Sequence, residues 1–119
     1  HEIQRNQLHN PTGAEAVYST AGKQQVTATI NYYMTNAKIM KEGCKTAVSR
    51  CTEAITPHTL AKDPGRLSSW KFFDKLLYEV KIVGTPGVGF GPSGEGYFRL
   101  TAFGSYENTV AAIERIKLI

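Results

Sequence analysis

The apolar residues between positions 26 and 44 restrict the fold of this chain more than any other feature. They recur at alternating steps of four and three residues, and they are Val26, Ile30, Tyr33, Ala37, Met40 and Cys44. This spacing places them on one face of an α-helix, for which Ser19 is a suitable N-cap. Lysines and amides occupy the other faces, so the apolar face has to pack against another part of a protein.

Two further helices are predicted in the second half of the chain. Ser68 and Ser69 precede the apolar stripe of WKFFDKLLYEV, and Ser105 precedes a last helix. That helix has Glu107 in its first turn and Arg115 in its last, as the helix dipole favours. All three helices have a start signal in the sequence.

Strands and a loop are predicted between these helices. KIVGTP predicts a short strand, and YFRLTAF predicts a second one because apolar and polar residues alternate along it. The glycines and prolines of GTPGVGFGPSGEG predict a loop between them. A long helix, short strands and two further helices are typical of an α/β fold, here a small α+β domain.

The segment from Val48 to Gly65 fits neither a helix nor a strand. Its few apolar residues follow neither period, and Pro57 and Pro64 interrupt it. The pattern therefore predicts a long loop. A structureless stretch of this length is unusual inside a compact domain.

The length and composition of the chain exclude several classes of protein. Its 119 residues suffice for one domain, and no apolar run approaches the ~18 residues that span a bilayer. The net charge is +4, but the lysines are scattered, which predicts no nucleic-acid interface. Two cysteines form no disulfide framework and suit a reducing compartment. We therefore expect a cytoplasmic protein without a membrane partner.

Arg99 is the best candidate for a binding residue. It lies in the predicted strand YFRLTAF among aromatic and apolar neighbours, where a half-buried guanidinium needs an anionic partner. The partner is either a local carboxylate such as Glu95 or the carboxylate of a ligand, which the forked guanidinium binds through two hydrogen bonds. Spacing alone does not decide between them.

Other patterns predict no chemistry. The glycine-rich loop runs into a strand and lacks the lysine of a P-loop, so it predicts a shaped loop beside a site and not a phosphate cradle. Cys44, Cys51 and His58 stand at seven-residue steps that match no zinc site, so no metal ligand is expected. No nucleophile with its base is evident, and no catalytic residue is predicted.

Two blocks of the sequence resemble the C-terminal part of the LL-diaminopimelate aminotransferases, which are fold-type I enzymes that depend on pyridoxal phosphate (PLP). The resemblance is carried by AVYSTAGKQQ, INYYMTNAKIMKEG, LSSWKFFDKLL and GTPGVGFGPSGEGYFRLTAFGSYEN. It covers roughly Gly13 to Thr46 and Leu67 to Ile119. It implies a non-matching segment over residues 1–12 and an aminotransferase C-terminal small domain over residues 13–119, with residues 48–66 anomalous.

The resemblance implies a function and a role for Arg99. In the family, the arginine of the FRLTAFG strand binds the carboxylate of the substrate, and the enzymes work as homodimers in lysine biosynthesis, exchanging an amino group between glutamate and a dicarboxylate substrate. The Schiff-base lysine belongs to the family's large domain, so we expect this chain to be inactive and to bind no PLP by itself. Asn10 begins the cofactor-ring motif Asn-Pro-Thr-Gly, but out of its family context.

Two alternatives stay open at this point. A related aminotransferase of aspartate or aromatic substrates fits the same resemblance, because residues absent from this chain contribute to substrate choice. A non-catalytic α/β module that binds a ligand or a protein fits the fold class alone.

The anomalous segments predict a property of the gene. The family carries strands of the form GFTVYGG and APYIWLKTP between the two matching blocks, and this sequence has neither. A back-translation of Val48–Thr59 exists that gives GFTVYGGNNAPY when read one base earlier, and one of His1–Gln7 gives TKYNGI. We hypothesise that His1 to about Thr12 and Val48 to about Arg66 are out-of-frame translations. Sequencing the encoding DNA is expected to recover the family text in the shifted frame, and unrelated codons there would contradict the hypothesis.

Overall fold

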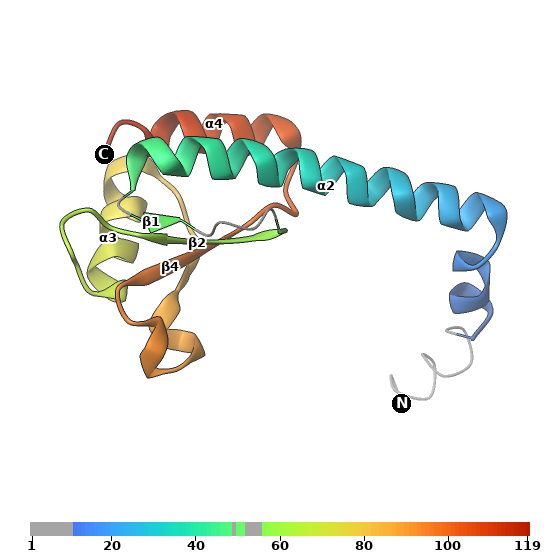
Figure 1. The fold of residues 1–119 in the computed structure, drawn as a ribbon, viewed down its shortest axis with the longest axis horizontal. Coiled ribbons are helices and arrows are strands. Elements are labelled where there is room, and N and C mark those ends of the chain that lie inside the picture. Colours follow the sequence, from blue (N-terminus) through green and yellow to red (C-terminus); the bar gives the residue numbers. More distant parts are fainter. Residues whose placement is uncertain (1–10, 49, 52–55) are drawn as a thin grey trace. The chain divides into compact units, whose positions relative to one another are not determined.

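The computed structural model describes residues 11–48, 50–51 and 56–119. Its named elements follow the chain in this order (Figure 1): α2 (Thr20–Ala47), β1 (Arg50–Cys51), β2 (His58–Lys62), α3 (Ser69–Val80), β3 (Thr85–Pro86), the 3₁₀ turns η1 (Gly87–Phe90) and η2 (Pro92–Gly94), β4 (Tyr97–Thr101) and α4 (Tyr106–Ile116). The chain divides into two compact units, one up to Tyr32 and one from Tyr33 to Ile119. In the first unit, residues 11–17 are helical and precede the first half of α2.

The second unit is built on a four-stranded sheet with the order β1-β2-β4-β3. All three pairings are antiparallel, and β4 lies between β2 and β3. Leu60 of β2 and Thr85 of β3 are both opposite Arg99. Arg99 therefore projects from the middle of a sheet and not from its edge.

The alternation predicted for YFRLTAF is present in β4. Phe98 and Leu100 are buried, at 0% and 8% exposure, whereas Tyr97 and Arg99 are half-buried and Thr101 is exposed. Successive side chains of a strand point to opposite faces. One face of the sheet is therefore the core, and the other, which carries Arg99, is left open by the described residues of this unit.

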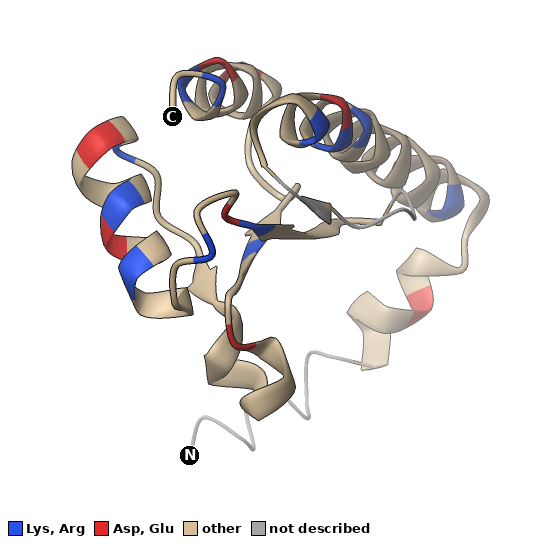
Figure 2. Cartoon of the chain, turned by 60° about the vertical axis from the view of Figure 1, so that its left-hand side comes forward, with Lys and Arg blue, Asp and Glu red and all other residues tan. Residues whose placement is uncertain are grey.

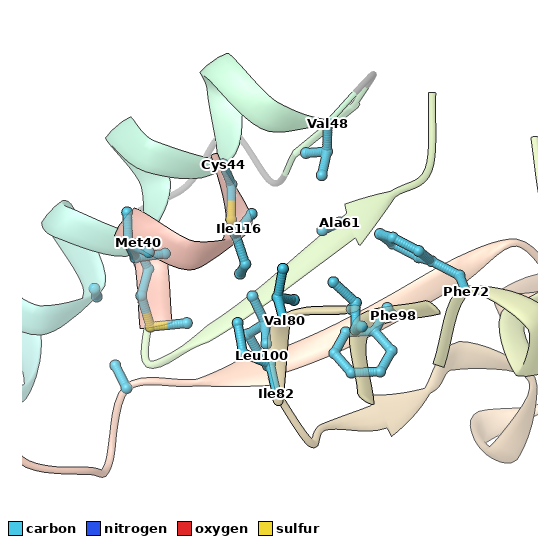
Figure 3. Packing of buried hydrophobic residues seen from close by; sticks show 14 residues of the cluster. Met40, Cys44, Val48, Ala61, Phe72, Val80, Ile82, Phe98, Leu100 and Ile116 are labelled. Atoms are coloured by element: carbon cyan, nitrogen blue, oxygen red, sulfur yellow. The ribbon is translucent and has the colours of Figure 1, made fainter. Parts of the chain in front are cut away.

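The three helices contribute the apolar side chains that cover the core face. In Figure 3, Met40 and Cys44 of α2, Phe72 of α3 and Ile116 of α4 gather with Phe98 of β4. The rings of Phe72 and Phe98 meet edge to face at 5.8 Å. Burying each large apolar side chain contributes about 1.5–3 kcal/mol, so this cluster is the main source of stability for the unit.

The predicted caps of the second and third helices are confirmed. The Ser68 hydroxyl accepts a hydrogen bond from the Lys71 amide, and the Ser105 hydroxyl accepts one from the Asn108 amide. Lys81 ends α3 in the left-handed conformation, with φ of 57°. The first residue of the predicted KIVGTP strand therefore belongs to the end of α3. The strand β3 is shorter than predicted and comprises Thr85–Pro86.

The prediction of a long loop over residues 48–65 is wrong. The described part of this segment contains β1 and β2, and β2 pairs with the whole length of β4. Two strands are therefore present in this segment, although it lacks the sequence text of the two family strands. The predicted loop GTPGVGFGPSGEG also begins with β3 and contains the short helical turns η1 and η2.

The first helix forms as predicted, but its apolar stripe is covered along only part of its length. Ala37, Met40 and Cys44 are buried, whereas Val26 and Ile30 in the first unit are 40% and 53% exposed. No helix in the described part of the chain combines the length and the apolar character needed to cross a membrane.

Gly43 tests the packing between α2 and α4. A Cβ atom at this position would overlap the Cγ2 atom of Ile113, which sits on a branched carbon and has little freedom to move. We expect Gly43→Ala to lower the free energy of unfolding by about 1–3 kcal/mol, despite the better helix propensity of alanine. Urea unfolding followed by circular dichroism measures the change. Gly13→Ala is the control, because nothing lies within 4 Å of a Cβ there; an equal loss in both variants would contradict this account of the packing.

Candidate functional site

A cavity of about 610 Å³ lies over the open face of the sheet. Strands β2 and β4 and the glycine-rich loop line it, through Thr56, His58, Leu60, Gly87, Phe90, Ser93, Gly94, Tyr97 and Arg99. Its size is that of an ordinary small-molecule site. None of these lining residues is acidic.

Arg99 has no ionic partner among the described residues. Its Nε atom is buried and makes no hydrogen bond. The Cζ atom lies 4.3 Å from the centre of the Phe90 ring, which covers one face of the guanidinium. An unpaired buried donor is costly, and the edge of a guanidinium is shaped for the two oxygens of a carboxylate. The geometry therefore favours an anionic ligand at this position.

Glu95, the local alternative, has another role in the structure. Its Oε1 atom accepts a hydrogen bond of 3.0 Å from the Ser69 amide at the start of α3. The Ser69 hydroxyl in turn donates to the carbonyl oxygens of Gly94 and Tyr97. Glu95 thus satisfies a free amide at a helix N-terminus and helps to fasten the glycine-rich loop to α3, instead of neutralising Arg99.

The glycine-rich loop is shaped by close backbone contacts. A Cβ atom on Gly87 would overlap the Gly94 carbonyl oxygen, and one on Gly94 would overlap the Gly87 carbonyl oxygen. Gly91 and Gly96 have φ of 122° and 81°, which favour glycine. The glycines let the loop fold back on itself and present Phe90 to Arg99.

His58 lines the same cavity, a position that analysis of the sequence did not predict. Its ring packs edge to face on Phe103 at 5.4 Å, and Phe103 packs in the same way on Tyr33 at 5.1 Å. Analysis of the sequence considered His58 only within a seven-residue spacing that matches no zinc site. Recognising β2 as a strand would have placed residues 58, 60 and 62 on one face together.

The metal-ligand pattern of the sequence has no counterpart in the described residues, which contain no group of three or more potential His, Cys, Asp or Glu ligands. Cys44 is fully buried, and this burial, with a smaller contribution from neighbouring Cys51, raises the pKa of its thiol to about 12. Such a thiol stays protonated at neutral pH and is a poor ligand and a poor nucleophile.

The described residues do not make up a PLP site. Among the described residues that line the cavity there is no lysine, and the Lys62 ammonium lies instead over the Tyr97 ring at 5.2 Å. The same described lining residues include no acidic group for a pyridine nitrogen. Asn10, the cofactor candidate of the sequence, lies outside the described residues.

Charged residues alternate in sign on the surface of α3. Blue and red segments alternate along this helix in Figure 2. The charged residues of its sequence are, in order, Lys71, Asp74, Lys75 and Glu79. This helix therefore presents no continuous basic stripe of the kind that binds nucleic acid.

The known proteins most similar in sequence that are described below share one name. The chain is 71% identical over 108 residues to an LL-diaminopimelate aminotransferase from Parabacteroides distasonis, covering 88% of the chain and 26% of that protein. It is 58% identical over 105 residues to the enzyme of the same name from Bacteroides thetaiotaomicron, covering 87% of the chain and 26% of the relative. Over nearly nine tenths of its length the chain matches one part of the LL-diaminopimelate aminotransferases. No family model matches it.

Solved structures agree on the fold. The L,L-diaminopimelate aminotransferase from Chlamydomonas reinhardtii matches with a TM-score of 0.80 and 36% identity, over 87% of the chain and 25% of that protein. An aromatic aminotransferase from Pyrococcus horikoshii matches with a TM-score of 0.78 over 88% of the chain and 29% of that protein, but at 23% identity it supports the fold alone. The predicted α/β class, as in the aminotransferase C-terminal domain, is confirmed. The chain spans about a quarter of the length of the LL-diaminopimelate aminotransferases it matches.

The two cysteines of the chain are expected to react at different rates. At pH 8, iodoacetamide should modify partly exposed Cys51 well before Cys44, because the raised pKa and full burial of Cys44 leave almost no accessible thiolate. Mass spectrometry of peptides after timed labelling measures both sites. In 8 M urea the two rates should converge, as ~8.5 is the usual pKa of a free cysteine; equal rates in the native chain would contradict the burial of Cys44.

Proposed function

We propose that this chain supplies the substrate-carboxylate anchor of a PLP-dependent aminotransferase that transfers an amino group from LL-diaminopimelate to 2-oxoglutarate, giving glutamate, or in the reverse direction. The observation that carries the proposal is the buried Arg99 Nε atom, which has no hydrogen-bond partner and lies in a cavity whose described lining residues include no acid. The relatives named as LL-diaminopimelate aminotransferases support the choice of reaction. Since the chain spans a quarter of them, the complete enzyme includes a further part, and we propose that it works as a cytoplasmic homodimer.

In this proposal, Arg99 holds and orients the substrate and does not take part in bond making. Two parallel hydrogen bonds from the guanidinium fix the plane of the carboxylate, and thereby the direction of the bond from it to the reacting carbon. Phe90 covers one face of the guanidinium and keeps water from it. PLP, bound by the rest of the enzyme, supplies the electron sink that amino transfer requires.

The proposal is tested by exchanging segments between this chain and its relative from Parabacteroides distasonis. The chimera that carries the present chain in place of the matching quarter of that enzyme is expected to transfer amino groups between LL-diaminopimelate and 2-oxoglutarate. Arg99→Lys in the chimera should lower kcat/KM by about 10²-fold, because the loss of a bidentate charged contact costs roughly 3 kcal/mol.

Lys62→Gln in the same chimera is the matched control. It removes one positive charge from the same face of the sheet, but the ammonium lies over Tyr97 and outside the cavity wall. It should change kcat/KM less than about threefold, the size of a weak exposed interaction. Equal effects of Arg99→Lys and Lys62→Gln, or a chimera that binds PLP and folds but is inactive, would overturn the proposal.

A further inference from the structure

We propose that Ser69, at the start of α3, is a positioning residue for Arg99: its hydroxyl holds the glycine-rich loop against β4, so that Phe90 stays stacked on the guanidinium. The inference rests on the proposed function, in which Arg99 binds a carboxylate, and it adds a residue that acts on this binding from outside the cavity. Ser69 is fully buried and is not among the described residues that line the cavity.

The Ser69 hydroxyl joins the two segments that carry Phe90 and Arg99. Its single proton is shared between the Gly94 carbonyl oxygen at 3.1 Å and the Tyr97 carbonyl oxygen at 2.9 Å. Gly94 ends η2 of the loop, whereas Tyr97 begins β4, two residues before Arg99. One buried group therefore sets the distance between the loop and the strand.

The position of Gly94 is transmitted to Phe90 through the backbone of the loop. The Gly94 amide donates to the Gly91 carbonyl oxygen, and the Gly91 amide donates to the Val88 carbonyl oxygen, each at 3.0 Å. Phe90 lies within these two turns, between Val88 and Gly91. Its residue is 57% exposed, so packing in the core does not hold the ring. The ring therefore follows the loop when the loop moves.

The guanidinium of Arg99 depends on this ring for its orientation. Its Nε atom is buried but makes no hydrogen bond with the described residues, and its Cζ atom lies 4.3 Å from the centre of the Phe90 ring. Stacking on an aromatic face suits the planar guanidinium. Without the ring, the guanidinium is freer to turn, and its two donors lie less often in the plane of a bound carboxylate.

Ser69 can act as a fixed point because α3 is held by the core. Phe72 and Leu76 of this helix are each 1% exposed, and Phe72 meets Phe98 of β4 edge to face. The Ser69 amide also donates to the Glu95 Oε1 atom at 3.0 Å, a contact that does not need the hydroxyl. Removal of the hydroxyl alone therefore leaves the start of α3 in place.

The first test measures the Arg99 Hε signal in the ¹⁵N-labelled 119-residue chain. Protons near the face of an aromatic ring are shielded, so Phe90→Leu gives the position of this signal without stacking. We expect Ser69→Ala to move the signal most of the way to that position. Ser69→Cys, which keeps the side-chain volume but donates only weakly, should move it in the same direction should the alanine variant unfold.

Ser68→Ala is the matched control for this measurement. It removes the neighbouring hydroxyl at the same end of α3, which accepts a hydrogen bond from the Lys71 amide of that helix. The loss of this cap should lower the urea midpoint of the chain and leave the Arg99 signal at its place. A shift that follows stability alone would be equal in Ser68→Ala and Ser69→Ala.

The second test uses the chimera with the enzyme from Parabacteroides distasonis. Ser69→Ala should raise the KM for LL-diaminopimelate roughly three- to tenfold, the size of a lost contact between arginine and an aromatic ring, and leave kcat nearly unchanged. Weaker folding would instead lower the concentration of active enzyme, and with it the apparent kcat. In a Phe90→Leu background, Ser69→Ala should raise KM no further, because a residue that acts through another is not additive with it.

The outcomes separate the inference from the proposed function. An unmoved Arg99 signal in folded Ser69→Ala, an equal rise of KM in Ser68→Ala, or additive effects of Ser69→Ala and Phe90→Leu would overturn the role of Ser69, while Arg99 remains a carboxylate anchor. A moved signal together with an unchanged kcat/KM of the Arg99→Lys chimera would overturn the proposed function and leave the link between Ser69 and Arg99 in place.

Discussion

The pairing of β4 between β2 and β3 is the constraint on which the rest of the second unit depends. It commits Phe98 and Leu100 to the core and Tyr97 and Arg99 to the opposite face, and a shift of one residue would exchange the two sets. The same register sets His58 diagonally across from Arg99. Core packing and the candidate site are thus two consequences of one alignment of strands, because burial of Phe98 holds Arg99 on the open face.

Two features of the chain lack the contacts that their chemistry requires. Arg99 has a buried nitrogen without a partner in the described residues, and Val26 and Ile30, two of the six residues of the helical apolar stripe, are exposed. Both features lower the stability of a folded protein, since buried donors normally form hydrogen bonds and an amphipathic helix normally buries its apolar face. The chain matches only about a quarter of the length of LL-diaminopimelate aminotransferases, so we expect both kinds of contact to come from the rest of such an enzyme.

The sequence predicted elements whose signals are local and missed those whose signals are not. The caps Ser68 and Ser105 and the alternation of β4 depend on neighbouring residues, and they are present. Strand β2 was missed because its burial runs against hydrophobicity: Leu60 is 41% exposed at the cavity, whereas Thr59 is buried. Arg99 was found because a charge in an apolar strand is itself a signal, but His58 could be placed only after the strand was known.

In β2 the apolar Leu60 is exposed and the polar Thr59 is buried, which bears on the chemistry of the open face of the sheet. A strand with one face toward bulk water carries polar residues there, yet here Leu60 joins the exposed ring of Phe90 beside Arg99. Apolar walls lower the local dielectric constant, which strengthens the attraction between a guanidinium and an anion. The wall also makes the unpaired charge more costly when the cavity is empty. This face of the sheet is therefore suited to a charged organic acid with an apolar middle, and not to solvent.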